Sequence, residues 1–255
     1  MQHNLAQFPG PLSTATTVTE LLQNTTLDPQ KNLPFQIFDI LRDLIVSVAL
    51  RPGQRISEKE IASALDASKT PVREALIRLD EIRLVKIVPQ SGTYVTRISM
   101  KRHRTACFIR LQLELGAVRA AAMLPPLDRD LHVFDTIVSG QTQALAAGDL
   151  DRFFILDEAF HRQIFAAPGL EDVWATARRS QFDVNRARHI KRLYRILRGG
   201  DVLREHSAIV EAIRAGNPDR AEAALREHIG NLDREIRDLF DDDRLLGFIE
   251  GPEAP

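Results

Sequence analysis

Residues 68–79 read SKTPVREALIRL, and this stretch places hydroxyls, a lysine and a proline ahead of an apolar helical stripe. Ser68 or Thr70 is expected to cap the helix, with Pro71 at the first helical position, where its missing N–H leaves no hydrogen bond unmade. The side chains expected to face the core are Val72, Ala75, Leu76 and Leu79. The exposed end of this helix therefore combines free amide donors, hydroxyls and cations, which suits the binding of phosphate.

Shorter elements on both sides of this helix complete a small module. An apolar stripe over residues 35–48 predicts a first helix, and Ser57 with Glu60 forms a capping box that opens a second, short helix. Residues 84–88 and 93–97 alternate like two strands, and PQSG between them is typical of a hairpin turn. A helix, a turn and a second helix with this chemistry, followed by a hairpin, predict a winged helix-turn-helix.

The module carries side chains that suit DNA. Lysine and hydroxyl groups bind phosphates, whereas Arg73, one turn into the helix, can bind the edge of a guanine through two hydrogen bonds. The tip of the hairpin, Gln90 to Gly92, is expected to act as a wing beside the duplex. The alternative is an ordinary surface helix with solvated charges, but the capping box and the hairpin favour DNA binding.

The chain after Ser99 shows helical patterns and no strand pattern. The expected helices are 101–122, 127–147, 150–167, 170–197, 201–215 and 218–240. Proline and glycine fall between most of them, and Asn217 followed by Pro218 is a strong helix start. The fold is therefore expected to be mainly α with a small β-hairpin, and its C-terminal part an all-helical bundle of six or seven helices.

The same patterns predict four segments along the chain. Residues 1–33 form a flexible arm, with a short helix near 17–23, and residues 34–99 form the DNA-binding domain. Residues 100–240 form the helical domain and residues 241–255 a loosely held tail. The apolar side chains of this tail that are candidates to dock are Leu245, Leu246, Phe248 and Ile249.

Four residues of the helical part suit a metal ion. Asp157 and His161 lie four residues apart, so they share one face of a helix, and His206 and His228 fall on two later helices. Three imidazoles and a carboxylate suit a divalent ion such as Zn²⁺ or Ni²⁺. The alternative is that each histidine is an ordinary core residue with a hydrogen-bond partner.

Composition excludes several classes of protein. The chain has 255 residues and 34 Lys and Arg against 35 Asp and Glu, so net charge alone says nothing about nucleic acid. One cysteine, Cys107, cannot form a disulfide within the chain, and the sequence shows neither a secretory signal nor an apolar run long enough to cross a membrane. A cytoplasmic protein without a membrane partner is expected.

An enzyme is not expected from these patterns. The sequence has no HExxH-type motif, no nucleophile motif and no phosphate-binding glycine loop. Glu158 follows Asp157 directly, and therefore points about 100° away around the helix. A metal-dependent hydrolase remains the less favoured alternative.

Residues 56–98 read ISEKEIASALDASKTPVREALIRLDEIRLVKIVPQSGTYVTRI and resemble the winged helix of GntR-type transcriptional regulators, with TPVREAL as the most specific part. The helical remainder is similar to the ligand-binding domain of the FadR subfamily, of the FCD type. The family positions that contact DNA would be Lys59, Ser68, Lys69, Thr70 and Arg73, with Gln90, Ser91 and Gly92 in the wing. Two residues depart from the family pattern, since arginine is usual where Lys69 stands and glycine where Arg83 stands.

The resemblance also extends to the candidate metal ligands. Family members carry an aspartate, a histidine four residues later and two further histidines, which match Asp157, His161, His206 and His228. A small carboxylate or hydroxy acid is expected to fill the open positions of the ion. Arg110 is a candidate to pair with this effector, the alternative being an ion pair with Glu114 four residues on.

These observations together predict a homodimeric, sequence-specific regulator of transcription. Two copies would present two recognition helices to the two halves of a symmetric operator in double-stranded DNA. Analogy with the family favours repression, with release from DNA when the small organic acid binds at the metal. A second possibility keeps the regulator and gives the metal a purely structural role.

Overall fold

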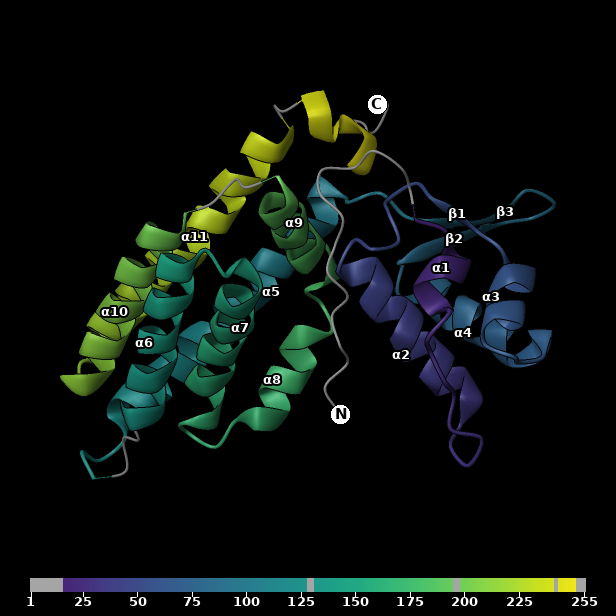
Figure 1. Cartoon of the computed structure of the whole chain (residues 1–255). Helices are drawn as coiled ribbons and strands as arrows, with labels where there is room; N and C mark the ends of the chain where they lie inside the picture. Colours follow the sequence, from purple (N-terminus) through teal and green to yellow (C-terminus); the bar gives the residue numbers. More distant parts are fainter. Residues whose placement is uncertain (1–15, 128–130, 195–197, 241–242, 251–255) are drawn as a thin grey trace. The chain divides into compact units, whose positions relative to one another are not determined.

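The computed structural model describes residues 16–127, 131–194, 198–240 and 243–250. The chain divides into two compact units (Figure 1). The first takes in the chain up to Met100 together with Asn185–Arg195 and the segment from Phe240 onward. The second takes in Lys101–Val184 and Ile196–Leu239.

Four helices build most of the first unit. They are α1 (Val18–Leu22), α2 (Leu33–Val46), α3 (Glu58–Ala64) and α4 (Lys69–Glu81). Helix α2 packs on α4, and α3 packs on both α1 and α4. The fully buried side chains between them include Ile37, Leu41, Ile45, Ile61, Val72 and Leu79. The apolar stripes expected on α2 and α4 therefore face one common core.

Helix α4 begins two residues earlier than a threonine cap would place it. Its N-cap is Ser68, so Pro71 is the third helical residue rather than the first, which corrects the alternative with Thr70 as cap. The third position tolerates proline for the same reason as the first, because amides of the first turn have no carbonyl partner within the helix. At α3 the Ser57 Oγ accepts from the Glu60 N–H at 3.4 Å, as one half of the expected capping box requires.

The strands form a three-stranded antiparallel sheet rather than a hairpin alone. β2 (Val85–Val88) pairs with β3 (Gly92–Val95), and β3 also pairs with β1 (Arg55–Ile56), which gives the order β1-β3-β2. Strand β1 has only two residues, too few for an alternating pattern, so nothing in the sequence predicts it. It anchors the hairpin to the segment just before α3.

The turn between α4 and β2 has a left-handed residue at Arg83, the position where the family usually has glycine. Arg83 has a φ of 58°, its N–H donates to the Asp80 carbonyl, and the Leu84 N–H donates to the Leu79 carbonyl. This pair of bonds is the Schellman pattern that ends many helices, with the left-handed residue just after the cap. The turn is therefore kept without glycine, and a side chain there carries a conformational strain of about 1–2 kcal/mol.

The segment that leaves β3 is held by parts of the first unit that come from late in the sequence. The Arg186 guanidinium donates to the backbone carbonyl of Thr96, and Ile98 pairs with Ile249 in a short parallel bridge. Leu245, in the 3₁₀ helix η1 (Asp243–Phe248), is fully buried. Part of the expected tail therefore docks through two of its apolar side chains.

Seven consecutive helices lie in the second half of the described sequence. They are α5 (Met100–Met123), α6 (Leu131–Ala147), α7 (Leu150–Ala166), α8 (Glu171–Arg178), α9 (Phe182–Leu193), α10 (Gly199–Arg214) and α11 (Pro218–Phe240). Helix α6 packs on α7 and α10, and α7 packs on α8. The core of the second unit includes Val118, Phe134, Phe160, Ile209 and Leu225. None of the described helices is both long and apolar enough to span a membrane.

One expected helix, 170–197, is wrong, because residues 179–181 separate α8 from α9. The Ser180 Oγ donates to the Ala177 carbonyl at 2.7 Å, and the backbone N–H groups of Ser180 and Gln181 reach carbonyls only three residues back. A serine that bonds its own helix end competes with continuation of the helix. The segment contains no glycine or proline, so the sequence pattern gave no sign of the break.

Arg83→Gly is expected to raise the free energy of unfolding of the first unit by about 1 kcal/mol, since glycine adopts a positive φ without the steric cost that arginine bears there. Urea unfolding followed by circular dichroism measures the change. Lys86→Gly, in strand β2, is the control and should lower stability instead. A loss of stability in Arg83→Gly would contradict the strained turn.

Candidate functional site

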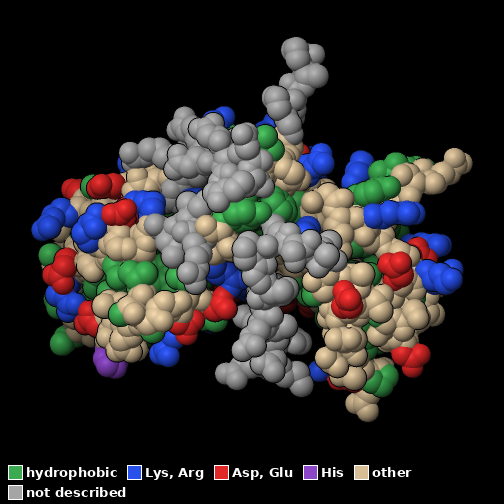
Figure 2. All heavy atoms as spheres, turned by 45° about the horizontal axis from the view of Figure 1, so that its top comes forward, with side chains coloured by type: hydrophobic (Ala, Val, Ile, Leu, Met, Phe, Trp, Pro, Cys, Tyr) green, Lys and Arg blue, Asp and Glu red, His purple; other side chains and the backbone are tan. Residues whose placement is uncertain are grey.

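The residues expected to contact DNA lie at the surface of the first unit. The exposed ones are Lys59, Ser68, Lys69, Thr70, Arg73, Gln90 and Ser91, and Gly92 is half-buried. Three of these, Ser68 to Thr70, occupy the N-terminal end of α4. Figure 2 shows Lys and Arg side chains interspersed with Asp and Glu over the face that it presents, in agreement with the near-zero net charge. The DNA-binding hypothesis therefore rests on these particular residues and not on a strongly basic surface.

Arg73 is held by an acidic residue of the neighbouring helix. Its Nε donates to Glu58 Oε2 at 3.2 Å and its Nη2 donates to Glu58 Oε1 at 3.0 Å. Glu58 is the first residue of α3, so this paired contact joins the two helices of the helix-turn-helix. The sequence pattern indicates Arg73 as a DNA contact but gives no sign that Glu58 binds it.

The hairpin tip is shaped by two backbone positions. Gln90 has a φ of 60° and Gly92 a φ of 138°. A Cβ at position 92 would lie 2.8 Å from the Arg55 Nε, so a side chain there would have to displace Arg55. Ser91 and Tyr94 share a hydrogen bond of 2.9 Å between their hydroxyls. Gln90 and Ser91 at this tip are exposed.

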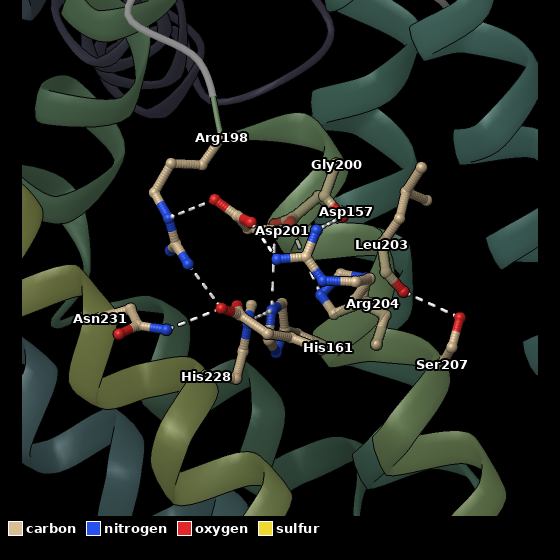
Figure 3. Close-up of polar contacts among 12 residues, drawn as sticks. Asp157, His161, Arg198, Gly200, Asp201, Leu203, Arg204, Ser207, His228 and Asn231 are labelled. Atoms are coloured by element: carbon tan, nitrogen blue, oxygen red, sulfur yellow. Dashed lines mark hydrogen bonds and ion pairs between the residues drawn. The ribbon is translucent and has the colours of Figure 1, made fainter.

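Three helices of the second unit bring the candidate metal ligands together. His161 comes from α7, His206 from α10 and His228 from α11, and one ring nitrogen of each lies within 4.8 Å of the others. Asp157, one turn before His161, places carboxylate oxygens 3.9 Å from the His161 Nε2 and 3.8 Å from the His206 Nε2. All four side chains are at most 5% exposed. The structure thus brings together the four residues that the sequence spacing singled out (Asp157, His161 and His228 are labelled in Figure 3).

Each of the three imidazoles has an oxygen acceptor at its Nδ1. The His161 Nδ1 lies 2.7 Å from Glu114 Oε2, the His206 Nδ1 lies 2.9 Å from Gln141 Oε1, and the His228 Nδ1 lies 2.7 Å from Glu205 Oε2. An acceptor at Nδ1 fixes the tautomer of a neutral imidazole, with the proton on Nδ1 and a lone pair on Nε2. The acceptors therefore direct three Nε2 lone pairs toward one another.

This arrangement fits a divalent cation. The Nε2 atoms of His161 and His228 lie 3.2 Å apart, which is a hydrogen-bond distance when one of them carries a proton and a repulsive contact of two lone pairs when neither does. Two histidine nitrogens that share one zinc ion, each about 2.0–2.1 Å from it, are separated by roughly this distance. Outer acceptors on the second ring nitrogen are also the usual companions of histidine ligands. The donor set of three nitrogens and a carboxylate suits zinc or nickel.

Glu114, the acceptor at the His161 Nδ1, belongs to a buried ion pair. The Arg110 Nε donates to Glu114 Oε1 at 2.6 Å, and both side chains are almost fully buried. Burial disfavours the charged form of Glu114, but the neighbouring Arg110 and His161 outweigh that effect and lower the pKa of Glu114 to about 2. Burial and the Arg110 charge lower the pKa of His161 to about 4, so its ring is neutral near pH 7. A neutral ring is the form that binds a metal ion.

Arg110 makes the ion pair with Glu114 that was the alternative to effector binding. The pair occupies the Nε side of the guanidinium. The two interpretations are therefore compatible. The effector contact of Arg110 stays a prediction.

A second charged network stands behind His228 (Figure 3). Glu205 Oε1 accepts from the Arg198 Nη2 at 2.5 Å and from the Asn231 Nδ2 at 2.7 Å, while Oε2 faces His228. Burial disfavours the charged form of Glu205, but the hydrogen bonds from His228 and Arg198 lower its pKa below the ordinary value. An ionised Glu205 is a strong acceptor for the His228 N–H.

The third imidazole is held by packing. The ring of His206 stacks on Phe160 with centroids 3.7 Å apart and planes 8° from parallel. Gln141, fully buried, supplies its acceptor, and within the described residues the Gln141 Nε2 has no partner of its own. Apolar stacking and a neutral acceptor thus orient His206, whereas carboxylates orient the other two rings.

Most of the residues that orient the ligands are not indicated by any pattern in the sequence. Glu205 and Gln141 lie 23 and 65 residues from the histidines that they contact, so no spacing rule connects them. Glu114 entered only as a possible partner of Arg110, and the helical spacing of the two was the signal that could be read.

Comparison with known proteins identifies both parts of the chain. Residues 35–95 match the family model described as bacterial regulatory proteins of the gntR family, and residues 106–231 match the FCD domain. The chain is 32% identical over 215 residues to the HTH-type transcriptional repressor RspR of Escherichia coli K12, over 84% of this chain and 93% of that protein. The chain belongs to the GntR family. It is a transcriptional regulator with an FCD domain.

Further relatives of this GntR-family regulator agree. A regulator of Streptomyces ambofaciens is 33% identical over 204 residues, which cover 79% of this chain and 81% of the relative. The crystal structure of a transcriptional regulator GntR from Rhodococcus sp. RHA1 is 25% identical, with a TM-score of 0.67, over 82% of this chain and 99% of that one. Such regulators are not enzymes, so the hydrolase alternative is set aside.

Glu114→Ala is expected to lower the free energy of unfolding of the helical unit by about 3–5 kcal/mol, because it leaves the buried Arg110 charge without its partner. Urea unfolding followed by the fluorescence of Trp174, the single tryptophan, measures the change. Glu222→Ala, which removes one of two acceptors of the exposed Arg119, is the matched control and should change little. If the two substitutions lowered the free energy of unfolding equally, Glu114 would not stabilise the buried Arg110 charge as proposed.

Proposed function

We propose that this regulator is a homodimeric repressor whose affinity for its operator is controlled by a small carboxylate bound at a divalent metal ion. The observation that carries the proposal is the convergence of three buried imidazoles, each with its outer nitrogen hydrogen-bonded, inside the segment that matches the FCD domain. The name of the relative RspR, a repressor, supports repression. The FadR subfamily, the dimer and the cytoplasmic location are parts of the same proposal.

On the DNA side, the exposed end of α4 is assigned to the operator. Lys69, Ser68 and Thr70 are placed at phosphates, where the helix N-terminus adds favourable partial charge. Arg73 is placed at a guanine edge in the major groove, and Lys59 at the backbone. The wing residues Gln90, Ser91 and Gly92 are placed beside the duplex.

The proposal divides the chain into four segments. Residues 1–33 form an N-terminal arm and residues 34–99 the DNA-binding domain. Residues 100–240 form the helical domain, and residues 241–255 form a tail.

On the effector side, Asp157, His161, His206 and His228 would hold the ion. The ion, when bound, would act as a Lewis acid with open coordination positions that a carboxylate oxygen can occupy. Arg110 is placed at the far end of the acid, because its ion pair with Glu114 uses the Nε and a guanidinium has further N–H donors. A guanidinium in a buried site prefers an anionic partner, so the proposed ligand class is a small organic acid.

Control of DNA binding requires that the acid binds two arrangements of the protein with different affinities. Release from the operator follows if the acid prefers the arrangement that binds DNA less well. A structural role for the metal is the second candidate, and the near-complete burial of the three histidines is the observation that favours it. In that case removal of the metal should unfold the helical domain, and no acid should bind there.

Arg73→Ala is expected to lose about 1–3 kcal/mol of affinity for the preferred operator and to relax the preference at one base pair. Fluorescence anisotropy with labelled duplexes, selected beforehand from random sequences with the unchanged protein, measures both effects. Lys69→Ala provides the contrast, because loss of a phosphate contact weakens all sequences alike and reduces the salt dependence. Unchanged affinity and preference in Arg73→Ala would remove Arg73 from the interface.

The metal and effector are tested by thermal melts with a panel of small mono-, di- and hydroxy-carboxylates, with and without chelator. A bound acid stabilises the folded state by about 2.7 kcal/mol at a hundredfold excess over its dissociation constant, and chelator should abolish this shift. His206→Ala should lower the metal content and abolish the shift, whereas His132→Ala, at an exposed histidine, should do neither. If no acid shifts the melt while chelator alone lowers it, the structural alternative holds.

A further inference from the structure

Arg73 is exposed but not free to sample many conformations. Its side chain is 66% exposed, yet two of its nitrogens bind the two carboxylate oxygens of Glu58 at 3.2 and 3.0 Å. A guanidinium and a carboxylate that share two parallel hydrogen bonds lie in one plane, which fixes direction as well as distance. The contact therefore fixes the plane of the Arg73 guanidinium and the direction in which the side chain points.

Glu58 is itself firmly placed. It is the first residue of α3, directly after the cap Ser57, and an acidic side chain is favoured at that end of a helix. Only 26% of its side chain is exposed. Helix α3 packs on α4, and Ile61 of α3 and Val72 of α4 are both fully buried. Glu58 is thus a rigid support for a long and otherwise mobile side chain.

The contact with Glu58 uses one edge of the Arg73 guanidinium, and a second edge of the group remains available to another acceptor. Nε and Nη2 face Glu58, while within the described residues Nη1 has no acceptor. The edge formed by Nη1 and the outer hydrogen of Nη2 can still donate two hydrogen bonds, which is what the O6 and N7 atoms of guanine accept. Glu58 and a guanine can therefore bind Arg73 at the same time.

We propose that Glu58 is a positioning residue that determines how strongly Arg73 discriminates guanine from other bases. Ordering Arg73 before DNA arrives removes part of the entropy cost of binding, and fixing its plane penalises bases that cannot accept both hydrogen bonds. The inference rests on the proposed base contact of Arg73. It goes further, because it assigns a second residue, an acid that itself touches no base.

The proposal has a recognisable signature, because Glu58 affects affinity and specificity in opposite directions. A carboxylate near the duplex repels phosphates, so its removal strengthens binding to every DNA sequence through electrostatics. The same removal frees Arg73 and weakens discrimination at the one base pair that Arg73 contacts. A purely electrostatic role would change all sequences by the same factor and leave their ratio unchanged.

The experiment compares four full-length variants with the unchanged protein on the selected operator, its single-base variants and an unrelated duplex. Glu58→Gln removes the charge, and Glu58→Asp keeps the charge but shortens the side chain. Glu74→Gln, at an exposed acid next to Arg73 in the same helix, is the matched control for charge. Arg73→Ala identifies the base pair in question, and circular dichroism with thermal melts confirms that each variant is folded.

Glu58→Gln and Glu58→Asp are both expected to lose about tenfold of the discrimination at the base pair that Arg73→Ala identifies, within the range that one bidentate contact provides. Glu74→Gln should keep the ratio unchanged while binding all duplexes somewhat more tightly. If Arg73→Ala relaxes one preference and the Glu58 variants keep it, the base contact stands and the positioning role is overturned. If Arg73→Ala relaxes none, both are overturned together.

Discussion

Three imidazoles share the interior of the helical unit, and each has an oxygen acceptor at Nδ1, the nitrogen that faces away from the other two. This constraint organises the unit, because with each Nδ1 as the donor all three Nε2 lone pairs face one space, in which the His161 and His228 Nε2 atoms lie 3.2 Å apart. Helices α5, α6 and α10 each supply one outer acceptor, and α7, α10 and α11 supply the rings. The packing of five helices is therefore tied to the orientation of three side chains.

The two charged acceptors are each balanced by an arginine. Glu114 is paired with Arg110 and Glu205 with Arg198, so the carboxylates can stay ionised where burial alone would favour their neutral forms. Replacing such a buried pair with apolar residues is often neutral or stabilising, so pairs of this kind are poor evidence of stability. Their effect here is orientation, since an ionised acceptor holds the Nδ1 proton more firmly than a neutral one.

The sequence predicted what depends on local pattern. The apolar stripe of α4, the hairpin and the run of long helices follow from periodicity and from breakers such as Asn217 and Pro218, and Asp157 with His161 follow from helical spacing. Features that depend on contacts between distant segments were missed. Strand β1 exists only because β3 pairs with it, and the break at Ser180 depends on one side-chain hydrogen bond.

The same kind of contact orients nitrogen-bearing side chains in both units, but it is exposed in the first unit and buried in the second. Behind Arg73 at the surface, and behind His161 and His228 in the interior, stands a carboxylate from another helix. At the surface, water screens the attraction and an ion pair adds little to stability, so Glu58 matters chiefly through the direction that it imposes. In the interior the same contact is strong and its loss would leave a buried group unsatisfied. Burial therefore determines the effect of such a carboxylate. An exposed one mainly orients its partner side chain, whereas a buried one also stabilises the fold.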